Sequence, residues 1–510
     1  MKSFVSRGMI AALALALGAL PVGGADEPAQ PVTPDALPEA RALLATLYAI
    51  SGKYILTGQH NYPNVKSRNS EFAAKYTGKT PVIFGTDFGF AKPGDTDSYL
   101  ARPDIVQEAI RQHHLGAIVA ICWHAVPPTA DEPVTFRPLP NSDPKALASI
   151  QGKLLDQQFK DVLTPGTALY EKWCAQVDAI AVFLKQLEDA RVPVLWRPYH
   201  EMNGDWFWWG GRTNEGGTIA LYRQIFDRLV HHHHLKNLLW VWSMDRVHRP
   251  EMEHAKYFPG IDFVDVLALD VYQNDFAQAY YDSLVALAQG KPLALAEVGN
   301  PPTPEILTQQ PRWTYFMTWA GMVRNTPRKE YDAIRQDPRY LGLEDPAYAR
   351  VTAAYRQACG LPLVHLEPAP ADFSGTWVLN QDDSTLGRTG AAFVPARLDV
   401  AQHGNELTIR TTRVVEYADD QVTEQQLTLD GAESHSEFMN APLVTTAHVL
   451  NNGQELALES VMTPPWGPAG SKMTTRDHWT LTRRGDRLSI ERVTSSPRGD
   501  QTITMIFDRR

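Results

Sequence analysis

The residues best suited to chemistry lie in segment 196–210, WRPYHEMNGDWFWWG. Among five tryptophan and phenylalanine side chains, this segment carries Arg197, His200, Glu201, Asn203 and Asp205. It continues from the apolar run 192–196, which is typical of a buried strand. A core segment has little use for so many ionisable and amide groups, because each would need a buried partner. We therefore interpret the segment as part of an active site at the end of a strand.

The apolar runs of the sequence predict the strands that must position this site. Eight of them are predicted to be strands: residues 54–58, 82–87, 117–124, 194–201, 238–243, 264–272, 293–298 and 315–321. Most are continuously apolar, as parallel strands covered on both faces are. Helical patterns lie between several of them, such as 173–190 and 218–230. The alternation predicts an α/β fold, a (β/α)8 TIM barrel, with the Pro-rich insertion 126–171 as a loop over its top.

Functional residues of such a barrel stand at the C-terminal ends of its strands. This rule selects His124, Arg197, His200, Glu201, Asp270, Tyr272, Glu297 and Trp319. Glu201 and Glu297 follow different strands and can face each other across the barrel mouth. Two carboxylates about 5 Å apart perform retaining glycoside hydrolysis, one as a protonated acid and one as an ionised nucleophile. Arg197 and Tyr272 could keep Glu297 ionised by charge and hydrogen bonding.

Four motifs together resemble glycoside hydrolase family 26, whose members are mostly β-mannanases. They are segment 196–210, CWHAVPP at 122–128, LALDVYQ at 267–273 and LALAEVG at 293–299. The resemblance covers roughly residues 37–366, and the spacing between the two glutamates (297 − 201 = 96) fits it. It implies that Glu201 is the general acid/base and Glu297 the nucleophile of a retaining endo-β-1,4-mannanase. It also implies that the substrate is contacted by His124, Arg197, His200, Trp206, Tyr272 and Trp319.

Several alternatives stay open at the level of the sequence. The same scaffold could cut mixed-linkage β-glucan or β-1,3-xylan instead of mannan, glucomannan or galactomannan. A non-catalytic glycan-binding protein is the alternative from another class, which the presence of both glutamates disfavours. Trp313 competes with Trp319 as a sugar contact, and Asp87 is either structural or substrate-binding. Trp208 and Trp209 are expected to pack in the core, and Asn203 to orient the loop.

Composition narrows the class of protein. The chain has 510 residues, enough for two or three domains, and 44% hydrophobic residues, enough for a large core. A formal net charge of −10 and a pI near 5.9 disfavour nucleic acid or an anionic membrane as partner. Thirteen tryptophans suit stacking on sugar rings. The expected partner is a β-mannan-type polysaccharide or oligosaccharide, bound by a monomer.

No metal and no cofactor are predicted. Four consecutive histidines, 231–234, would point in different directions on a helix, so we interpret them as a solvated helix C-terminus. The three cysteines, Cys122, Cys174 and Cys359, have no zinc spacing and do not form a disulfide scaffold, although one bridge could form. Cys122 lies in an apolar run and is expected in the core.

The beginning of the chain has the pattern of a signal peptide over residues 1–25. Lys2 and Arg7 precede the apolar run 9–20, which is short for a membrane span, and small residues offer cleavage after Ala25. A retained membrane anchor is the alternative. The mature protein is expected to be secreted or periplasmic, without a membrane contact. Residues 26–37 are predicted to be a linker before a catalytic domain at 38–366.

After a second predicted linker at 367–371, the pattern changes to alternation between apolar and polar residues. Eight strands are predicted in residues 372–510: 376–379, 397–400, 406–409, 426–429, 447–450, 478–481, 488–490 and 503–506. Turns such as 451–453 and 484–486 separate them. The pattern predicts a smaller antiparallel β-barrel or sandwich, and its opening, 372–377, loosely resembles lipocalin-like barrels. It has no catalytic constellation, so a carbohydrate-binding and a passive stabilising role are both open.

Overall fold

The computed structural model describes residues 30–62, 66–89, 101–214, 216–364, 370–387, 390, 394–415, 419–438, 441–464, 471–481, 485–496 and 499–510. The predicted signal peptide, the first part of linker 26–37 and most of linker 367–371 lie outside these ranges, and so does the predicted turn residue at 484. The predicted domain boundaries therefore stay predictions. Within the described ranges, none of the helices combines the length and apolar character that crossing a membrane requires.

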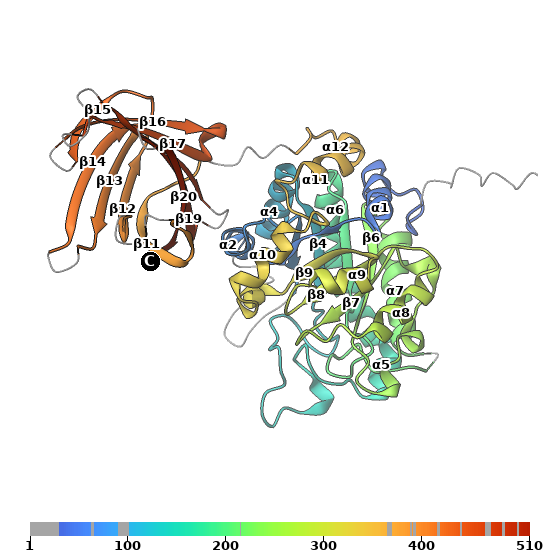
Figure 1. Cartoon of the computed structure of the whole chain (residues 1–510). Helices are drawn as coiled ribbons and strands as arrows, with labels where there is room; N and C mark the ends of the chain where they lie inside the picture. Colours follow the sequence, from blue (N-terminus) through green and yellow to red (C-terminus); the bar gives the residue numbers. More distant parts are fainter. Residues whose placement is uncertain are drawn as a thin grey trace, which may run out of the picture.

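A closed barrel of parallel strands forms the first and larger part of the chain (Figure 1). Its eight strands are β2 (Gly58–His60), β3 (Ile83–Asp87), β4 (Ile118–Trp123), β5 (Val194–Pro198), β6 (Leu238–Asp245), β7 (Val266–Val271), β8 (Leu293–Val298) and β9 (Trp313–Thr318). They pair in chain order, and β9 closes the sheet by pairing with both β8 and β2. Every residue of these strands is buried, so the predicted TIM barrel is confirmed.

Helices surround the barrel (Figure 1), and their buried apolar residues belong to the same hydrophobic cores as the strands. They are α1 (Pro38–Ile50), α2 (Arg68–Thr77), α4 (Arg102–Leu115), α5 (Asp156–Val162), α6 (Ala168–Asp189), α7 (Thr218–Asp227), α8 (Gln278–Ala288), α9 (Pro304–Gln309), α10 (Arg328–Gln336), α11 (Pro346–Val351) and α12 (Ala353–Ala358). In α6, the side chain of Thr167 caps the first turn by accepting from the Tyr170 amide. Val177, Ile180 and Leu184 repeat at helical spacing and are buried.

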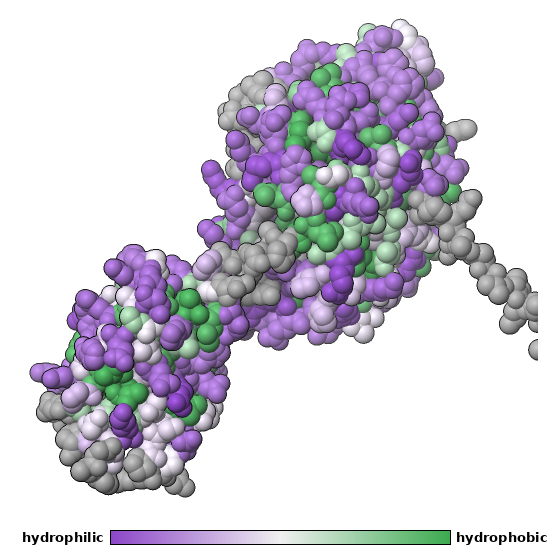
Figure 2. Space-filling view, turned by 90° about the horizontal axis from the view of Figure 1, so that it is seen from above, coloured by the Kyte–Doolittle hydropathy of each residue, from purple (hydrophilic) through white to green (hydrophobic). Residues whose placement is uncertain are grey.

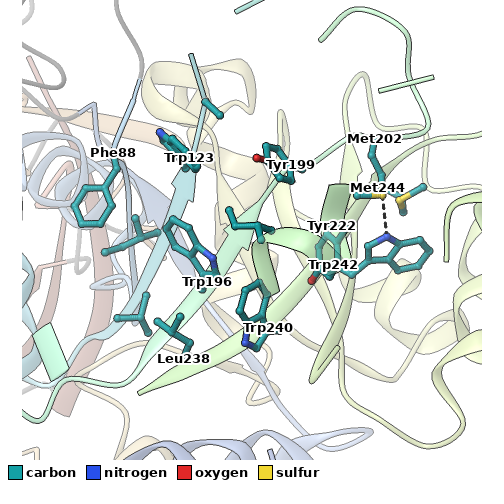
Figure 3. Packing of buried hydrophobic residues seen from close by; sticks show 14 of the residues in the cluster. Phe88, Trp123, Trp196, Tyr199, Met202, Tyr222, Leu238, Trp240, Trp242 and Met244 are labelled. Carbon is teal, nitrogen blue, oxygen red and sulfur yellow. Dashed lines mark hydrogen bonds between the residues drawn. The ribbon is translucent and has the colours of Figure 1, made fainter. Parts of the chain in front are cut away.

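Two hydrophobic cores hold the barrel together. Alternate strand residues such as Leu195, Val241 and Ala268 fill the interior, and this core continues into Leu43 and Leu47 of α1, which lie at the N-terminal end of the strands. The other core fills the space between strands and helices and contains most of the aromatic residues. Figure 3 shows part of it, with the indole of Trp242 donating to the sulfur of Met202 at 3.3 Å.

Most tryptophans belong to these cores and are not available to sugars. Of the thirteen in the chain, nine are less than 2% exposed: Trp123, Trp173, Trp196, Trp208, Trp209, Trp240, Trp242, Trp313 and Trp377. The expectation that the high tryptophan count reflects sugar stacking is therefore wrong for the majority of them. Trp313 lies inside strand β9 at 0% exposure, so it does not compete with Trp319 as a sugar contact.

The strand boundaries differ from the predictions in three places. The first predicted strand is split into β1 (Ile55–Leu56), which pairs with β9 and with β10 (Tyr340–Leu341), and the barrel strand β2. The fourth ends at Pro198 because Tyr199 turns the chain with φ of 49°. The eighth ends at Thr318, before Trp319. The insertion 126–171 contains helix α5 and the start of α6 and is not loop alone.

The second part of the chain is one antiparallel sheet of ten strands that curls into a nearly closed barrel (Figure 1). The strands are β11 (Gly375–Thr385), β12 (Arg397–His403), β13 (Glu406–Arg413), β14 (Gln421–Thr428), β15 (Ser434–Phe438), β16 (Ala441–Leu450), β17 (Glu455–Met462), β18 (Met473–Leu481), β19 (Arg487–Ser496) and β20 (Gly499–Arg509). The edge strands β14 and β15 meet through Gln425, whose side chain donates to Ser436 at 3.4 Å. The predicted antiparallel barrel is confirmed, with two strands, β15 and β17, that the sequence pattern missed.

The two parts resemble each other on the face that Figure 2 shows. Figure 2 shows hydrophilic residues over most of the visible face of both, with hydrophobic residues scattered between them. An ion pair joins the parts, from Arg328 at the start of α10 to Asp486, with 3.8 Å between nitrogen and oxygen. All three cysteines are buried and free, so the described residues contain no disulfide.

Candidate active site

Glu201 stands in a strained turn after β5. Its φ is 50° and that of Tyr199 is 49°, both in the left-handed region that residues other than glycine rarely adopt. The turn is held by the amide of Glu201, which donates to the carbonyl of Ser243 on β6 at 2.9 Å. Such strain persists only where the surrounding structure imposes it, and it is concentrated at functional sites. Glu201 as a whole is 9% exposed, at the C-terminal end of the barrel.

Glu297 reaches the same end of the barrel through an irregularity in β8. Ala294 and Ala296 belong to the interior core, whereas Leu293, Leu295 and Val298 belong to the outer core. Simple alternation would therefore turn residue 297 outward, toward the helices. A register shift between β7 and β8 instead pairs Glu297 with Asp270. Such irregularities commonly re-aim a side chain beside an active site.

Arg197 joins the acidic residues of two strands, β7 and β8, into one network. Its Nη1 donates to Asp270 at 2.8 Å and its Nη2 to Glu297 at 2.7 Å. Ser243 donates its hydroxyl to the other oxygen of Asp270 at 2.6 Å, and the hydroxyl of Tyr272 donates to the second oxygen of Glu297. Both oxygens of Glu297 thus accept a hydrogen bond from a group that stabilises the ionised form. The structure brings Arg197 and Tyr272 to the partner that the sequence suggested.

The electrostatic environment of Glu201 differs from that of Glu297. Burial raises the pKa of Glu201 well above its ordinary value, and the negative charges of Glu297, Asp270 and Asp245 raise it further. The indole of Trp206 donates to Glu201 Oε2 at 2.7 Å and opposes this shift. Burial acts to lower the pKa of Arg197, but Asp270 and Glu297 outweigh it and hold that pKa well above the ordinary value. The site therefore contains one carboxyl that favours its proton and one that is paired with a cation.

His124 and His200 lie against each other beside the glutamates, with ring centroids 4.4 Å apart. The Nδ1 of His124 bonds to the carboxylate of Asp87 at the end of β3, and its amide donates to the same side chain at 3.2 Å. Cys122 and the amide of Gly89 also donate to Asp87. Burial acts to raise the pKa of Asp87, but His124, Cys122 and Gly89 together hold it below its ordinary value. Asp87 therefore positions His124, which decides between its two predicted readings.

His200 is neutral in this setting. Burial and the charges of Arg197, His124 and His60 hold its pKa well below the ordinary value. Neither ring nitrogen has a hydrogen-bond partner among the described residues, although the ring is only 1% exposed. A buried ring with unpaired nitrogens can serve a polar ligand that enters the barrel mouth.

The two predicted sugar-contacting tryptophans have different surroundings. Trp206 is half-buried and supports Glu201 through its indole N–H. Trp319 follows β9, is 9% exposed, and stacks on the ring of His60 with centroids 3.8 Å apart. His60 is fully buried, and burial lowers its pKa to about 3. The sequence reading missed His60, although it stands at the C-terminal end of β2, where the rule used for the other strands would have found it.

Other residues of the segment 196–210 hold the site in shape. Trp208 and Trp209 are completely buried and donate to the carbonyls of Ala125 and His200, at 2.7 and 2.8 Å. Asn203 donates to the carbonyl of Asp245 at 2.7 Å and accepts from its amide at 2.9 Å. These contacts agree with the packing and loop-orienting roles that the sequence indicated.

The histidine run ends helix α7 through one π-helical turn, Arg228–His232. His231, His232 and His234 are exposed, and His233 bonds to Asp178 at 2.7 Å. Asp178, His232 and His233 lie close enough to share a cation. Arg228 already donates to both oxygens of Asp178, at 2.8 and 2.7 Å, so this cluster is a satisfied ion pair. That the protein works without metal or cofactor stays a prediction.

Comparison with known proteins gives the class of protein that this fold and site define. Residues 32–338 match the model of Glycosyl hydrolase family 26. The match includes Glu201, Glu297 and every other predicted site residue. The chain belongs to Glycosyl hydrolase family 26.

Individual relatives agree with the family. The chain is 36% identical over 300 residues to a mannan endo-1,4-beta-mannosidase of Thermothelomyces thermophilus, covering 57% of this chain and 57% of the relative. The solved structure of GH26A from Muricauda sp. is 39% identical with a TM-score of 0.56, over 61% of this chain and 98% of that one. A GH26-CBM35 beta-(1,4)-mannanase of Podospora anserina is 31% identical with a TM-score of 0.51, over 62% and 68%. The chain spans about half the length of the curated relatives that it matches.

Proposed function

We propose that this protein is a retaining endo-β-1,4-mannanase that cleaves mannan, glucomannan or galactomannan. The observation that carries the proposal is the contrast between the two glutamates. Glu201 is a buried carboxyl whose pKa is raised by burial and by neighbouring acids, whereas Glu297 is bonded to Arg197 and Tyr272. One carboxyl that favours its proton and one that is bonded to a cation are the pair that the double-displacement reaction requires.

In the first step, the ionised carboxylate of Glu297 attacks the anomeric carbon of the bound sugar. The bond from that carbon to the glycosidic oxygen breaks, and Glu201 gives its proton to the leaving oxygen. A covalent glycosyl–enzyme ester and a free sugar hydroxyl result. Tyr272 and Arg197 bind both oxygens of Glu297 and thereby orient the attack.

In the second step, Glu201 is ionised and removes a proton from water. The water oxygen attacks the anomeric carbon, the ester bond breaks, and the carboxylate of Glu297 is regenerated. The proton ends on Glu201, which restores the starting state. The N–H of Trp206 stabilises the ionised Glu201 of this step, because it donates to Oε2 at 2.7 Å.

Early products tell this mechanism from the inverting one. Two displacements at the same carbon retain configuration, so proton NMR of the first product should show the β-anomer. An initial α-anomer would contradict the nucleophilic role of Glu297. It would mean that a water molecule lies between more widely spaced carboxyl groups.

The substrate proposal rests on the relatives, several of which are named mannan endo-1,4-beta-mannosidases. Linear mannan, glucomannan or galactomannan should be cut at least tenfold faster than lichenan or β-1,3-xylan in a reducing-sugar assay. Faster cleavage of mixed-linkage β-glucan would favour the alternative substrate. Binding of mannan without any release of reducing ends would favour a glycan-binding protein.

Three further properties belong to the proposal. The pattern of residues 1–25 supports export to the periplasm or the medium, and the acidic net charge supports a protein free of membrane and nucleic acid. We expect a monomer in solution, in which no second copy completes the site. Cell fractionation and light scattering on the mature protein test these points.

A further inference from the structure

The interior of the second barrel is apolar in one half along its axis and largely polar in the other half. One half is packed with apolar side chains, among them Ile409, Leu427, Leu458, Trp479 and Ile490. Most of the inward positions in the other half are polar, namely Thr411, Thr423, Gln425, Ser436, Ser460 and Thr475, with Leu443, Met462 and Met473 beside them. The strand registers place these side chains on the inner face, since Thr411 pairs with Thr423 and Ser460 with Thr475. A barrel that served only as a stabilising module would fill this half with apolar residues as well.

The polar half encloses a cavity. A cavity of about 130 Å³, open to solvent, is lined by these hydroxyl and amide groups together with Arg413, Phe438, Met462 and Met473. Two acidic residues at its edge, Glu424 and Glu437, occupy outward positions and are exposed. Part of the lining is already hydrogen-bonded, because Gln425 donates to Thr445 at 3.3 Å and Thr445 bonds to Ser460 at 2.9 Å. A cavity of this size can hold one small ring-shaped ligand.

The cavity contains a cation that has no counter-ion among the described residues. Arg413 stands at the end of β13 with its guanidinium over the ring of Phe438, 4.5 Å from the centroid. Its Nε is buried and has no hydrogen-bond partner, and no ion pair involves Arg413 within the described part of the chain. Burial lowers the pKa of Arg413, and the charge of Arg492 acts in the same direction. Arg413 is half-buried, so its charge is partly removed from water, and pairing with an anion would stabilise it.

The neighbouring charges do not neutralise Arg413. Arg492 and Asp477 also face inward, but they form a bidentate pair with two contacts of 2.6 Å. That pair is neutral as a whole, which leaves this half of the interior with one uncompensated positive charge. The charge matches one carboxylate, because a guanidinium binds a carboxylate through two parallel hydrogen bonds.

We propose that the second barrel binds a sugar acid, a hydroxylated ring with one carboxylate such as a hexuronate. The carboxylate would pair with the fork of Arg413. The ring hydroxyls would bond to the threonine and serine hydroxyls, and the apolar face of the ring would lie on Phe438 and Met462. A fatty acid fits less well, because side chains already fill the apolar half of the barrel, with Trp479 3% and Ile490 1% exposed.

The test is isothermal titration of the full-length protein with glucuronate, glucose and octanoate in separate experiments. We expect saturable binding of glucuronate, at least tenfold tighter than that of glucose, and no saturation by octanoate. Arg413→Gln should weaken glucuronate binding at least tenfold, and Arg413→Lys should lie between, since a lysine keeps the charge but not the fork. Arg410→Gln is the matched control, because Arg410 is exposed on the same strand and should leave binding unchanged.

The rate of mannan hydrolysis and the melting temperature of each variant show whether the protein is folded. The proposal fails if glucuronate does not saturate the wild-type protein. It also fails if Arg413→Gln, still folded, binds glucuronate as tightly as the wild type, or if octanoate binds more tightly than glucuronate. None of these outcomes touches the proposed hydrolysis, which depends on residues of the first barrel.

Discussion

The two barrels of this protein each place arginine side chains inside, but in opposite circumstances. In the parallel barrel, Arg197 is bonded to Asp270 at 2.8 Å and to Glu297 at 2.7 Å. In the antiparallel barrel, the guanidinium of Arg413 lies over an aromatic ring, 4.5 Å from its centroid, and no ion pair involves Arg413 within the described residues. The first arginine is therefore paired within the chain, whereas the second is half-buried and has no counter-ion in the part of the chain that the structure describes. We infer that Arg197 positions a reactive carboxylate in the first barrel, whereas Arg413 in the second barrel is available to bind a ligand.

The largest expected effect is on activity, and it compares the loss of a carboxylate in the first barrel with the loss of one in the second. Glu201→Ala should lower kcat on mannan by roughly 10²–10⁴-fold, the usual range for a lost general acid, and Glu297→Ala at least as much. Asp477→Asn removes an inward carboxylate of the second barrel and should leave kcat/KM within about twofold.

Azide and an aryl glycoside sharpen this first experiment. An activated leaving group needs little protonation, so Glu201→Ala should lose less in the first step and azide should rescue its turnover with retained configuration. Near wild-type activity of either alanine variant on mannan would refute the assignment of the two glutamates.

The second effect compares the two arginines directly. Arg197→Met leaves Asp270 and Glu297 buried without their cation, so it should lower the free energy of unfolding by about 3–5 kcal/mol. Arg413→Met removes a charge that has no counter-ion and should change the stability of its barrel by less than about 1 kcal/mol. Urea unfolding followed by tryptophan fluorescence measures both. Equal losses in the two variants would show that Arg413 has a structural partner after all.

The third effect concerns pH. Glu201 must be protonated to act as an acid, so kcat/KM is retained below its raised pKa and lost as pH rises through it. Trp206→Phe removes a donor that favours the ionised form, so the basic limb of the profile should move to higher pH. The loss of one hydrogen bond should also lower kcat/KM about tenfold, or about 1–1.5 kcal/mol.

Trp479→Phe is the control for this profile. Trp479 is buried in the second barrel, and its indole N–H has no hydrogen-bond partner among the residues that the structure describes. The substitution should leave the basic limb where it is in the wild type. A basic limb that stays in place in Trp206→Phe would show that the indole does not tune the acid.

The smallest effect is expected from removing the second barrel. The predicted catalytic residues all precede β10, and the two parts are joined by the ion pair of Arg328 with Asp486. A chain that ends at residue 366 should therefore keep kcat/KM on mannopentaose within about tenfold, since a TIM barrel is self-contained. A greater loss in a protein still folded by circular dichroism would mean that the second barrel completes the site.

Much of the catalytic part was predictable because its signals are local. Continuous apolar runs located the barrel strands, and polar residues at their ends located Arg197, Glu201 and Glu297. The direction of the Glu297 side chain was not predictable, because it depends on the register shift between β7 and β8. No residue type in the sequence indicates such a shift. The support of Glu201 by Trp206 was likewise hidden, since a tryptophan beside an acid suggests stacking before it suggests a hydrogen bond.

The second barrel also contains features that the sequence pattern did not predict, namely two of its strands. Strand β15, Ser434–Phe438, escaped the pattern because its inward positions face the polar half of the interior and not the apolar core. Strand β17, Glu455–Met462, escaped because Ala457 lies between Leu456 and Leu458 and blurs the alternation. A strand whose inner face lines a polar cavity lacks the alternation of apolar and polar residues from which strands are predicted.

The left-handed turn at Glu201 has a consequence for how this protein can evolve. Conformations such as those of Tyr199 and Glu201 each destabilise a fold by about 1–3 kcal/mol. Selection for cleavage therefore opposes selection for stability at this turn. In a lineage that no longer needed to cut polysaccharide, glycine or asparagine at position 201 would be doubly favoured, since either adopts this backbone with little strain. Descendants that gave up catalysis here should melt at higher temperature than their active ancestors while still recognising the same sugars.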